Sequence, residues 1–228
     1  MWKLKAILKR LEDFYGPPPK QKLRDPFEMM LWEMSAELAT DEKRGAAFQA
    51  LKKRIGSTPK KIAAASPLEM VEVTKLGGME PARRAKRMQD AAVLAIEEFG
   101  GNLRSILKRP LKDAVKALRK FPSVGGPGAE KILLLTRSYP LLALESNGLR
   151  VLRRLGYGPP VSSNDGKDYA AGYRAVREAL APQVAAAGFD TLIAAHHLLR
   201  RHGKELCKTS RPLCAKCPLA RDCPSDTL

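Results

Sequence analysis

The chain has 228 residues, which is the length of one large domain or of two small ones. Lys and Arg number 41 against 24 for Asp and Glu, so the formal net charge is +17 at pH 7. A hydrophobic fraction of 44% and a charged fraction of 29% are typical of a globular protein and exclude a wholly disordered chain.

The composition also bears on the compartment and the partner. No apolar run approaches the roughly 20 residues that cross a bilayer. The lysine-rich first ten residues lack the apolar core of a signal peptide. We therefore expect a soluble cytoplasmic protein with no membrane association. The positive charge favours a polyanionic partner, nucleic acid before an anionic membrane surface, although the same charge also fits solubility alone.

Helical periodicity runs through most of the chain. Apolar residues at helical spacing predict a basic amphipathic helix over 2–15, which Gly16 and the following prolines end. From Phe27 to Leu38, apolar residues recur at i, i+3, i+4, i+7 and i+11, which predicts a helix with a buried stripe. Because alternating β-branched patterns are nearly absent, we expect an all-α protein. Further helices are expected over 42–54, 59–65, 67–75, 82–99 and 111–120.

A glycine-rich turn follows the helix that ends near Lys120. The turn Phe121–Gly128 reads FPSVGGPG, and an apolar helix over 129–136 comes next, with Pro127 suited to its first turn. Such a turn exposes successive backbone N–H groups beside a helix N-terminus, which can bind a DNA phosphate without sequence recognition. The alternative is a plain turn between two helices of a bundle. We expect the phosphate contacts at Val124, Gly125, Gly126 and Gly128.

Near the C-terminus, the sequence predicts one more helix. Asp190 is placed to cap it, the side chains of Leu192, Ile193, His196 and Leu199 share one face, and Gly203 is placed to end it. His196 and the adjacent His197 are metal-ligand types, but a histidine on an apolar face more often forms a core hydrogen bond. We expect both histidines in the core.

All four cysteines of the chain lie in its last 22 residues, at Cys207, Cys214, Cys217 and Cys223. Zinc modules generally pair two short C-x2–4-C hooks, and this loop has only one such hook. Four thiolates within 17 positions favour one compact polynuclear cluster, so we expect a 4Fe–4S cluster, with zinc as the alternative.

Together these motifs resemble a known family. The cysteine loop and the preceding HHLLRRHG (196–203) resemble the C-terminal iron–sulfur loop of the endonuclease III group of helix–hairpin–helix DNA glycosylases. FPSVG (121–125) resembles that group's Leu-Pro-Gly-Val-Gly turn. Pro26-Phe27-Glu28, followed by Ala39-Thr40-Asp41, resembles its first barrel helix. The resemblance extends from about Leu23 to Cys223.

The resemblance implies a two-lobed all-α fold, a six-helix barrel plus an iron–sulfur lobe, with DNA bound across the cleft between them. The barrel with its helix–hairpin–helix would be residues 23–135, and the cluster domain would be residues 1–22 and 136–228. It further implies a monomer whose partner is double-stranded DNA carrying a damaged or mispaired base. In a prokaryote, such a protein would associate with the nucleoid.

The resemblance also implies which residues are catalytic. The family's lysine nucleophile corresponds to Pro127, which argues against AP-lyase activity; Lys131, one helical turn on, is the only nearby amine. The alternative for Lys131 is a solvated or phosphate-pairing lysine. Glu145 takes the place of the family's aspartate, so a carboxylate is present to stabilise a cationic sugar. The alternative is that Glu145 only caps a helix or pairs with Arg150.

A second carboxylate, Glu33, resembles the glutamate that protonates the departing purine in the adenine DNA glycosylase branch. The alternative is an ordinary half-exposed glutamate. Leu38 replaces the family's glutamine that fills the gap left by the flipped nucleotide. Lys208, Arg211 and Lys216 are expected to face DNA phosphate from a loop that the cluster braces structurally.

The expected function is therefore that of a base-excision-repair DNA glycosylase. It would be monofunctional, flip the base out of the duplex and hydrolyse its N-glycosidic bond. The alternatives are a catalytically silent relative that recognises damaged or distorted duplex, and a zinc-stabilised DNA-binding module.

Overall fold

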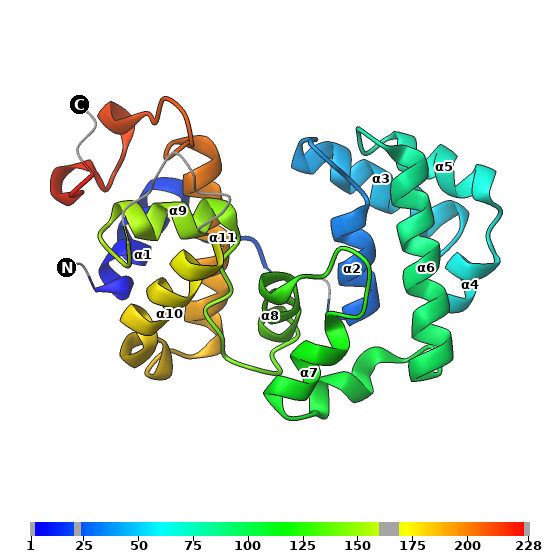
Figure 1. Ribbon diagram of the computed structural model, residues 1–228. Coiled ribbons are helices and arrows are strands. Elements are labelled where there is room, and N and C mark those ends of the chain that lie inside the picture. Colours follow the sequence, from blue (N-terminus) through cyan, green and yellow to red (C-terminus); the bar gives the residue numbers. More distant parts are fainter. Residues whose placement is uncertain (1–2, 21–23, 160–168, 226–228) are drawn as a thin grey trace. The chain divides into compact units, whose positions relative to one another are not determined.

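The computed structural model describes residues 3–20, 24–159 and 169–225, and every regular element within these ranges is helical. The all-α prediction is therefore confirmed. The chain forms two compact units (Figure 1): a central unit of residues 21–138, and a terminal unit in which residues 1–20 join residues 139–228. Within the described residues, no helix is both long and apolar enough to cross a membrane.

The central unit is a bundle whose longest helix is α6, and α4 and α5 pack against it (Figure 1). Its elements are α2 (Pro26–Met34), α3 (Asp41–Arg54), α4 (Pro59–Ala64), α5 (Pro67–Lys75), α6 (Pro81–Phe99), the 3-10 helix η1 (Leu103–Lys108), α7 (Leu111–Leu118) and α8 (Gly126–Leu135).

Side-chain caps define where several of these helices begin. The Asp25 carboxylate accepts from the backbone N–H groups of Phe27 and Glu28 at the start of α2. Ser66 and Glu69 form a reciprocal capping box at the start of α5. A proline occupies the first turn of α2, α4, α5, α6 and α8, where the missing N–H has no helical partner to lose.

The prediction that one helix runs as far as Leu38 was wrong. Helix α2 ends at Met34, and Leu38 lies in the following loop with φ +50° and a side chain that is 87% exposed. A contact from distant sequence ends the helix, since the Ser35 carbonyl accepts a hydrogen bond from Arg84 Nη1 at 2.7 Å. Glu37 instead forms an isolated parallel bridge with Gly78. The apolar stripe therefore stops one turn before Leu38.

Arg84 is the most deeply buried charged residue of the central unit, with 1% of its surface exposed. Its guanidinium donates to four backbone carbonyls at 2.7–3.0 Å: those of Ser35 after α2, of Thr74 in the last turn of α5, and of Gly78 and Met79 before α6. A planar fork of five donors can satisfy such a set, which one ammonium cannot do. Arg84 thereby joins the α2–α3 loop to the α5–α6 loop.

The terminal unit contains four α-helices and two short 3-10 turns in its described part. These are α1 (Leu4–Tyr15), α9 (Ser146–Arg154), α10 (Tyr169–Ala185), α11 (Phe189–Glu205), η2 (Cys214–Lys216) and η3 (Ala220–Asp222). Helix α11 packs against both α1 and α9, and α9 also contacts α10. The helix predicted over 2–15 is present as α1, which begins at Leu4 and ends at Tyr15. Residue 2 of the chain lies outside the described residues.

Two details predicted for α11 were wrong. The helix begins after Gly188, with Asp190 in its first turn and not at the cap, and it continues through Gly203 to Glu205. Gly203 is needed for close approach of two helices, because a Cβ there would lie 2.4 Å from the backbone oxygen of Asn147 in α9. The close contact between α9 and α11 therefore explains why position 203 is a glycine.

Candidate functional site

In the central unit, the glycine-rich turn between α7 and α8 has an open surface. Helix α8 begins at Gly126, earlier than the predicted Ala129. A Cβ at Gly125 or at Gly126 would meet no atom within 4 Å, so these glycines are not needed to pack the chain against itself. Among the described residues, the N–H groups of Gly126 and Gly128 donate to no backbone carbonyl. The helix N-terminus therefore presents unpaired donors, the arrangement that binds anions.

The structure brings Glu33 and Lys131 together on α2 and α8. Lys131 Nζ lies 2.8 Å from Glu33 Oε1, and the lysine side chain is only 18% exposed. Arg44 of α3, which sequence patterns did not indicate, places its Nη1 3.2 Å from both Glu33 Oε2 and the Glu33 carbonyl. Two cationic side chains therefore pair with one carboxylate. The three side chains are therefore a charge cluster, and their predicted roles in catalysis stay predictions.

Glu145 is the N-cap of α9 in the terminal unit. Its Oε1 accepts from the backbone N–H of Gly148 at 2.8 Å, and its Oε2 accepts from Asn147 Nδ2 at 2.7 Å. The predicted alternative of a capping role is thus present in the structure. A carboxylate has about four lone-pair sites. Capping uses two, which leaves acceptor capacity for a substrate or a water molecule.

A chain of hydrogen bonds continues from Glu145 to the cysteine loop. Arg150 Nη2 donates to Asn147 Oδ1 at 2.8 Å and to the Gly203 carbonyl at 2.8 Å. Arg150 Nε donates to the Cys207 carbonyl at 2.9 Å. Arg150 is 8% exposed, so this path lies inside the unit. Asn147 hydrogen-bonds to both Glu145 and Arg150 and so links the two side chains.

The four cysteines surround one small cavity of about 40 Å³ in the same unit. None forms a disulfide, and all are half-buried. Burial raises the pKa of the Cys217 and Cys223 thiols. In the part of the chain that the structure describes, no three His, Cys, Asp or Glu side chains form a group that could hold a single metal ion. All four cysteines therefore line one cavity without a disulfide among them.

Two nitrogen-bearing side chains contact these thiols. Arg154 Nη1 lies 3.3 Å from Cys207 Sγ, and His202 Nε2 lies 3.4 Å from Cys217 Sγ. The other ring nitrogen of His202 lies 3.0 Å from the Tyr15 hydroxyl. Burial lowers the pKa of His202 to about 4, so its ring is neutral at pH 7. The sequence patterns did not identify any of these three residues.

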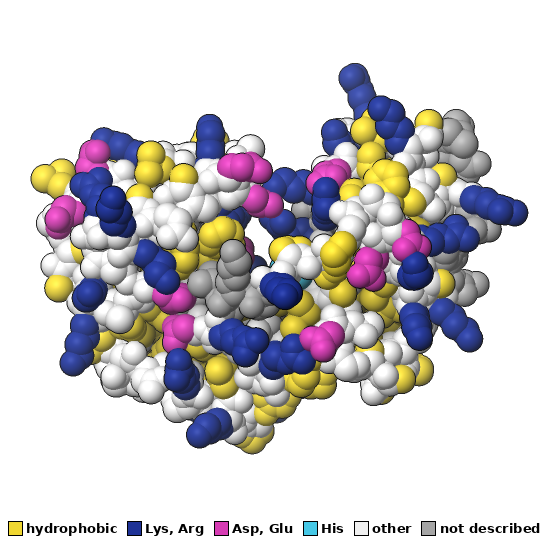
Figure 2. All heavy atoms as spheres, turned by 180° about the vertical axis from the view of Figure 1, so that it is seen from behind, with side chains coloured by type: hydrophobic (Ala, Val, Ile, Leu, Met, Phe, Trp, Pro, Cys, Tyr) yellow, Lys and Arg dark blue, Asp and Glu magenta, His cyan; other side chains and the backbone are white. Residues whose placement is uncertain are grey.

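The basic residues predicted to face phosphate and the histidine predicted in the core lie in the terminal unit. Lys208, Arg211 and Lys216 are exposed on the cysteine loop, as a phosphate-facing role requires. Figure 2 shows Lys and Arg side chains spread over the face in view, with fewer Asp and Glu among them. His196 is buried, and its Nδ1 lies 2.9 Å from the Ala143 carbonyl, which confirms its predicted core role.

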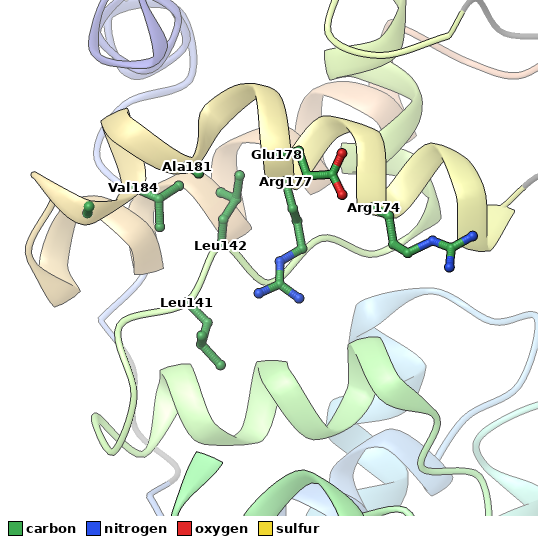
Figure 3. A pocket seen from close by; sticks show the side chains of 8 residues that line it. Leu141, Leu142, Arg174, Arg177, Glu178, Ala181 and Val184 are labelled. Atoms are coloured by element: carbon green, nitrogen blue, oxygen red, sulfur yellow. The ribbon is translucent and has the colours of Figure 1, made fainter. Parts of the chain in front are cut away.

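A larger cavity of about 410 Å³ in the terminal unit was not indicated by any sequence pattern. Arg174, Arg177 and Glu178 line it from α10, and Leu141 and Leu142 line it from the segment that precedes α9 (Figure 3). Its lining combines apolar groups with charged groups of both signs.

No protein-family model matches the chain. The endonuclease III of Thermotoga maritima is 24% identical over 206 residues, which are 90% of this chain and 86% of that protein. The fold matches a trapped endonuclease III–DNA covalent intermediate with a TM-score of 0.72 and 20% identity, covering 99% of this chain and 97% of that chain. It also matches the H. pylori 3-methyladenine DNA glycosylase MagIII bound to 1,N6-ethenoadenine, with a TM-score of 0.67 and 16% identity over 90% and 98% of the two chains. The chain is therefore similar in sequence to endonuclease III, and it has the fold of the endonuclease III and MagIII structures.

Proposed function

We propose that this protein is a monofunctional DNA glycosylase of base excision repair, which acts as a monomer on double-stranded DNA with a damaged or mispaired base. The observation that carries the proposal is Glu145, a carboxylate fixed at a helix start by two hydrogen bonds. It occupies the place of the family's catalytic aspartate. The proposal also rests on the similarity to endonuclease III in sequence and fold, although a fold alone does not define an activity.

The proposed chemistry needs a preorganised negative charge. The target nucleotide must leave the base stack, because the sugar C1′ is inaccessible to a side chain inside the duplex. Departure of the base leaves an oxocarbenium-like sugar, which Glu145 would stabilise while it orients the attacking water. The product is a free base and an intact abasic site.

Two residues, Pro127 and Lys131, support the proposal that the protein has no lyase step. Pro127 stands at the position of the family's lysine and has no nucleophile. Lys131 Nζ forms an ion pair with Glu33 Oε1 at 2.8 Å, and this pairing opposes its use as a nucleophile toward C1′. The endonuclease III structure with a covalent DNA intermediate therefore resembles this chain in fold but not in the proposed chemistry. Glu33 is retained as the candidate that would protonate a departing purine.

We assign DNA backbone binding to the turn Val124–Gly128 and to the exposed Lys208, Arg211 and Lys216. The unpaired N–H groups of Gly126 and Gly128 support the assignment of the turn. In domain terms, residues 23–135 are the proposed barrel with the helix–hairpin–helix, and residues 1–22 and 136–228 are the proposed cluster domain. The glycine turn and the basic residues of the cysteine loop would both bind phosphate and not base edges.

The proposed cofactor is a 4Fe–4S cluster held by Cys207, Cys214, Cys217 and Cys223. In such a cluster each thiolate binds a different iron, and four cysteines that line one cavity fit this arrangement. When bound, the cluster would brace the exposed basic loop. No step of the base chemistry depends on it.

The test is a panel of duplex oligonucleotides that carry uracil, oxidised pyrimidines, alkylated bases or adenine opposite 8-oxoguanine. We expect release of one class of base and an abasic strand that breaks only after alkali treatment. Borohydride should trap almost no protein–DNA adduct. Efficient trapping that disappears in Lys131→Ala would contradict the monofunctional assignment. Tight binding of damaged duplex with no excision would support the catalytically silent alternative.

A further inference from the structure

The thiols proposed to hold the cluster have hydrogen-bond donors beside them that the proposed activity does not use. Arg154, in the last turn of α9, directs Nη1 at Cys207 Sγ from 3.3 Å. The same guanidinium donates to the carbonyls of Lys208 at 2.7 Å and Thr209 at 3.1 Å. Arg154 also lines the four-cysteine cavity. One side chain therefore binds the first segment of the loop and places a permanent positive charge against one sulfur.

A second donor reaches the cavity from α11. His202 is 1% exposed, and its Nε2 lies 3.4 Å from Cys217 Sγ. A thiolate bound to iron carries no proton, so it can only accept, and Nε2 must carry the hydrogen. Nδ1 is then an acceptor, and the Tyr15 hydroxyl at 3.0 Å donates to it. Tyr15 of α1 thus fixes the tautomer that His202 needs, as outer partners do at metal sites.

We propose that Arg154 and His202 tune the reduction potential of the cluster, with Tyr15 as the positioning residue for His202. This inference rests on the proposed cofactor. Donors to cluster sulfurs and nearby positive charge stabilise the reduced, more negatively charged state relative to the oxidised state. They therefore raise the potential of the one-electron couple. The same contacts make the cluster harder to oxidise, which suits a cluster with a structural role on DNA.

The test is the midpoint potential of the purified iron-loaded protein, measured by protein-film voltammetry together with its iron content. We expect Arg154→Gln to lower the potential, so that the ratio of reduced to oxidised cluster at a fixed potential falls about tenfold, the scale of one charge-assisted hydrogen bond. Tyr15→Phe should shift it in the same direction and by less. The matched control is Arg221→Gln, which removes an exposed charge from the same loop and, among the described contacts, no bond to sulfur.

Equal shifts in Arg154→Gln and Arg221→Gln would overturn the inference, because loop charge alone would then explain them. Unchanged potentials in both Arg154→Gln and Tyr15→Phe would also overturn it, while the proposed cofactor would stand. If Arg154→Gln loses its iron, Arg154→Lys and Tyr15→Phe decide between the outcomes. A wild-type protein with zinc and no iron would refute the cofactor itself, which is a separate result.

Discussion

The contacts of Asn147 give the sharpest prediction about the proposed catalytic carboxylate. Asn147 donates to Glu145 Oε2 at 2.7 Å and accepts from Arg150 Nη2 at 2.8 Å, so it connects the carboxylate to a buried cation. Removing it with Asn147→Ala leaves Glu145 with the Gly148 N–H alone. Each lost bond involves a charged partner and is worth roughly 1.5–3 kcal/mol. The carboxylate would then lose its fixed orientation.

We expect Asn147→Ala to lower the single-turnover excision rate by roughly 10–100-fold, because displacing a catalytic group by about 1 Å costs about that much. Asn147→Asp separates the two contacts, since it keeps the acceptor for Arg150 but places a second carboxylate against Glu145. Two carboxylates in contact raise one of their pKa values. Below that pKa, a shared proton restores the hydrogen bond. The excision rate of Asn147→Asp should therefore rise as the pH falls.

The assay is a single-turnover time course on the base identified by the panel, at several pH values, with iron content and duplex affinity measured on each variant. Wild-type rates in both Asn147 variants would refute the positioning role. So would an Asn147→Asp profile that is parallel to that of the wild type. Loss of iron in both variants would place the defect in the cysteine loop and not in Glu145.

Three further predictions concern the central unit. Arg84→Leu should lower the free energy of unfolding by roughly 3–5 kcal/mol, because four carbonyls, two of them in buried contacts, lose their donor; a urea midpoint close to that of the wild type would contradict this. Burial raises the pKa of Glu28, but hydrogen bonds from Lys52 and Ser57 outweigh it and lower that pKa overall, so its stabilisation is lost as the pH falls through the acid range. Glu28→Gln should therefore flatten the loss of stability below about pH 5 in acid titrations, and an unchanged acid transition would count against it. Gly125→Val should weaken intact and damaged duplexes by the same factor in a binding titration, with Gly45→Ala as the control; a selective loss for damaged duplex would show base contact at this turn.

The features that sequence predicted well are those encoded over short distances. Cysteine spacing, the FPSVGGPG turn and the apolar periodicity of α1 or α7 each lie within one segment, where local chemistry decides the structure. Helix α10 was not predicted, because its frequent alanines and an internal Pro182 dilute the apolar stripe. The buried residues of that helix become clear only once it packs against α9.

The errors and omissions come from contacts between distant segments. Leu38 was expected on a buried stripe, but Arg84, nearly 50 positions away, takes the carbonyl that would have continued the helix. Gly203 was expected to end α11, but it lies inside the helix where α9 approaches. Arg44 was missed because its partner Glu33 lies on another helix. Charge clusters assembled from several helices leave no periodic signal in the sequence.

The most direct test of the central claim is the excision rate of Glu145→Gln, measured under single-turnover conditions beside Glu145→Asp. Glutamine keeps an oxygen for the Gly148 N–H and so preserves the cap of α9, but it removes the negative charge. We predict that Glu145→Gln loses about 10²–10³ in rate while it keeps its iron and its duplex affinity. Glu145→Asp, which retains the charge, should keep more of the activity. A Glu145→Gln protein that excises its base at the wild-type rate would contradict the account.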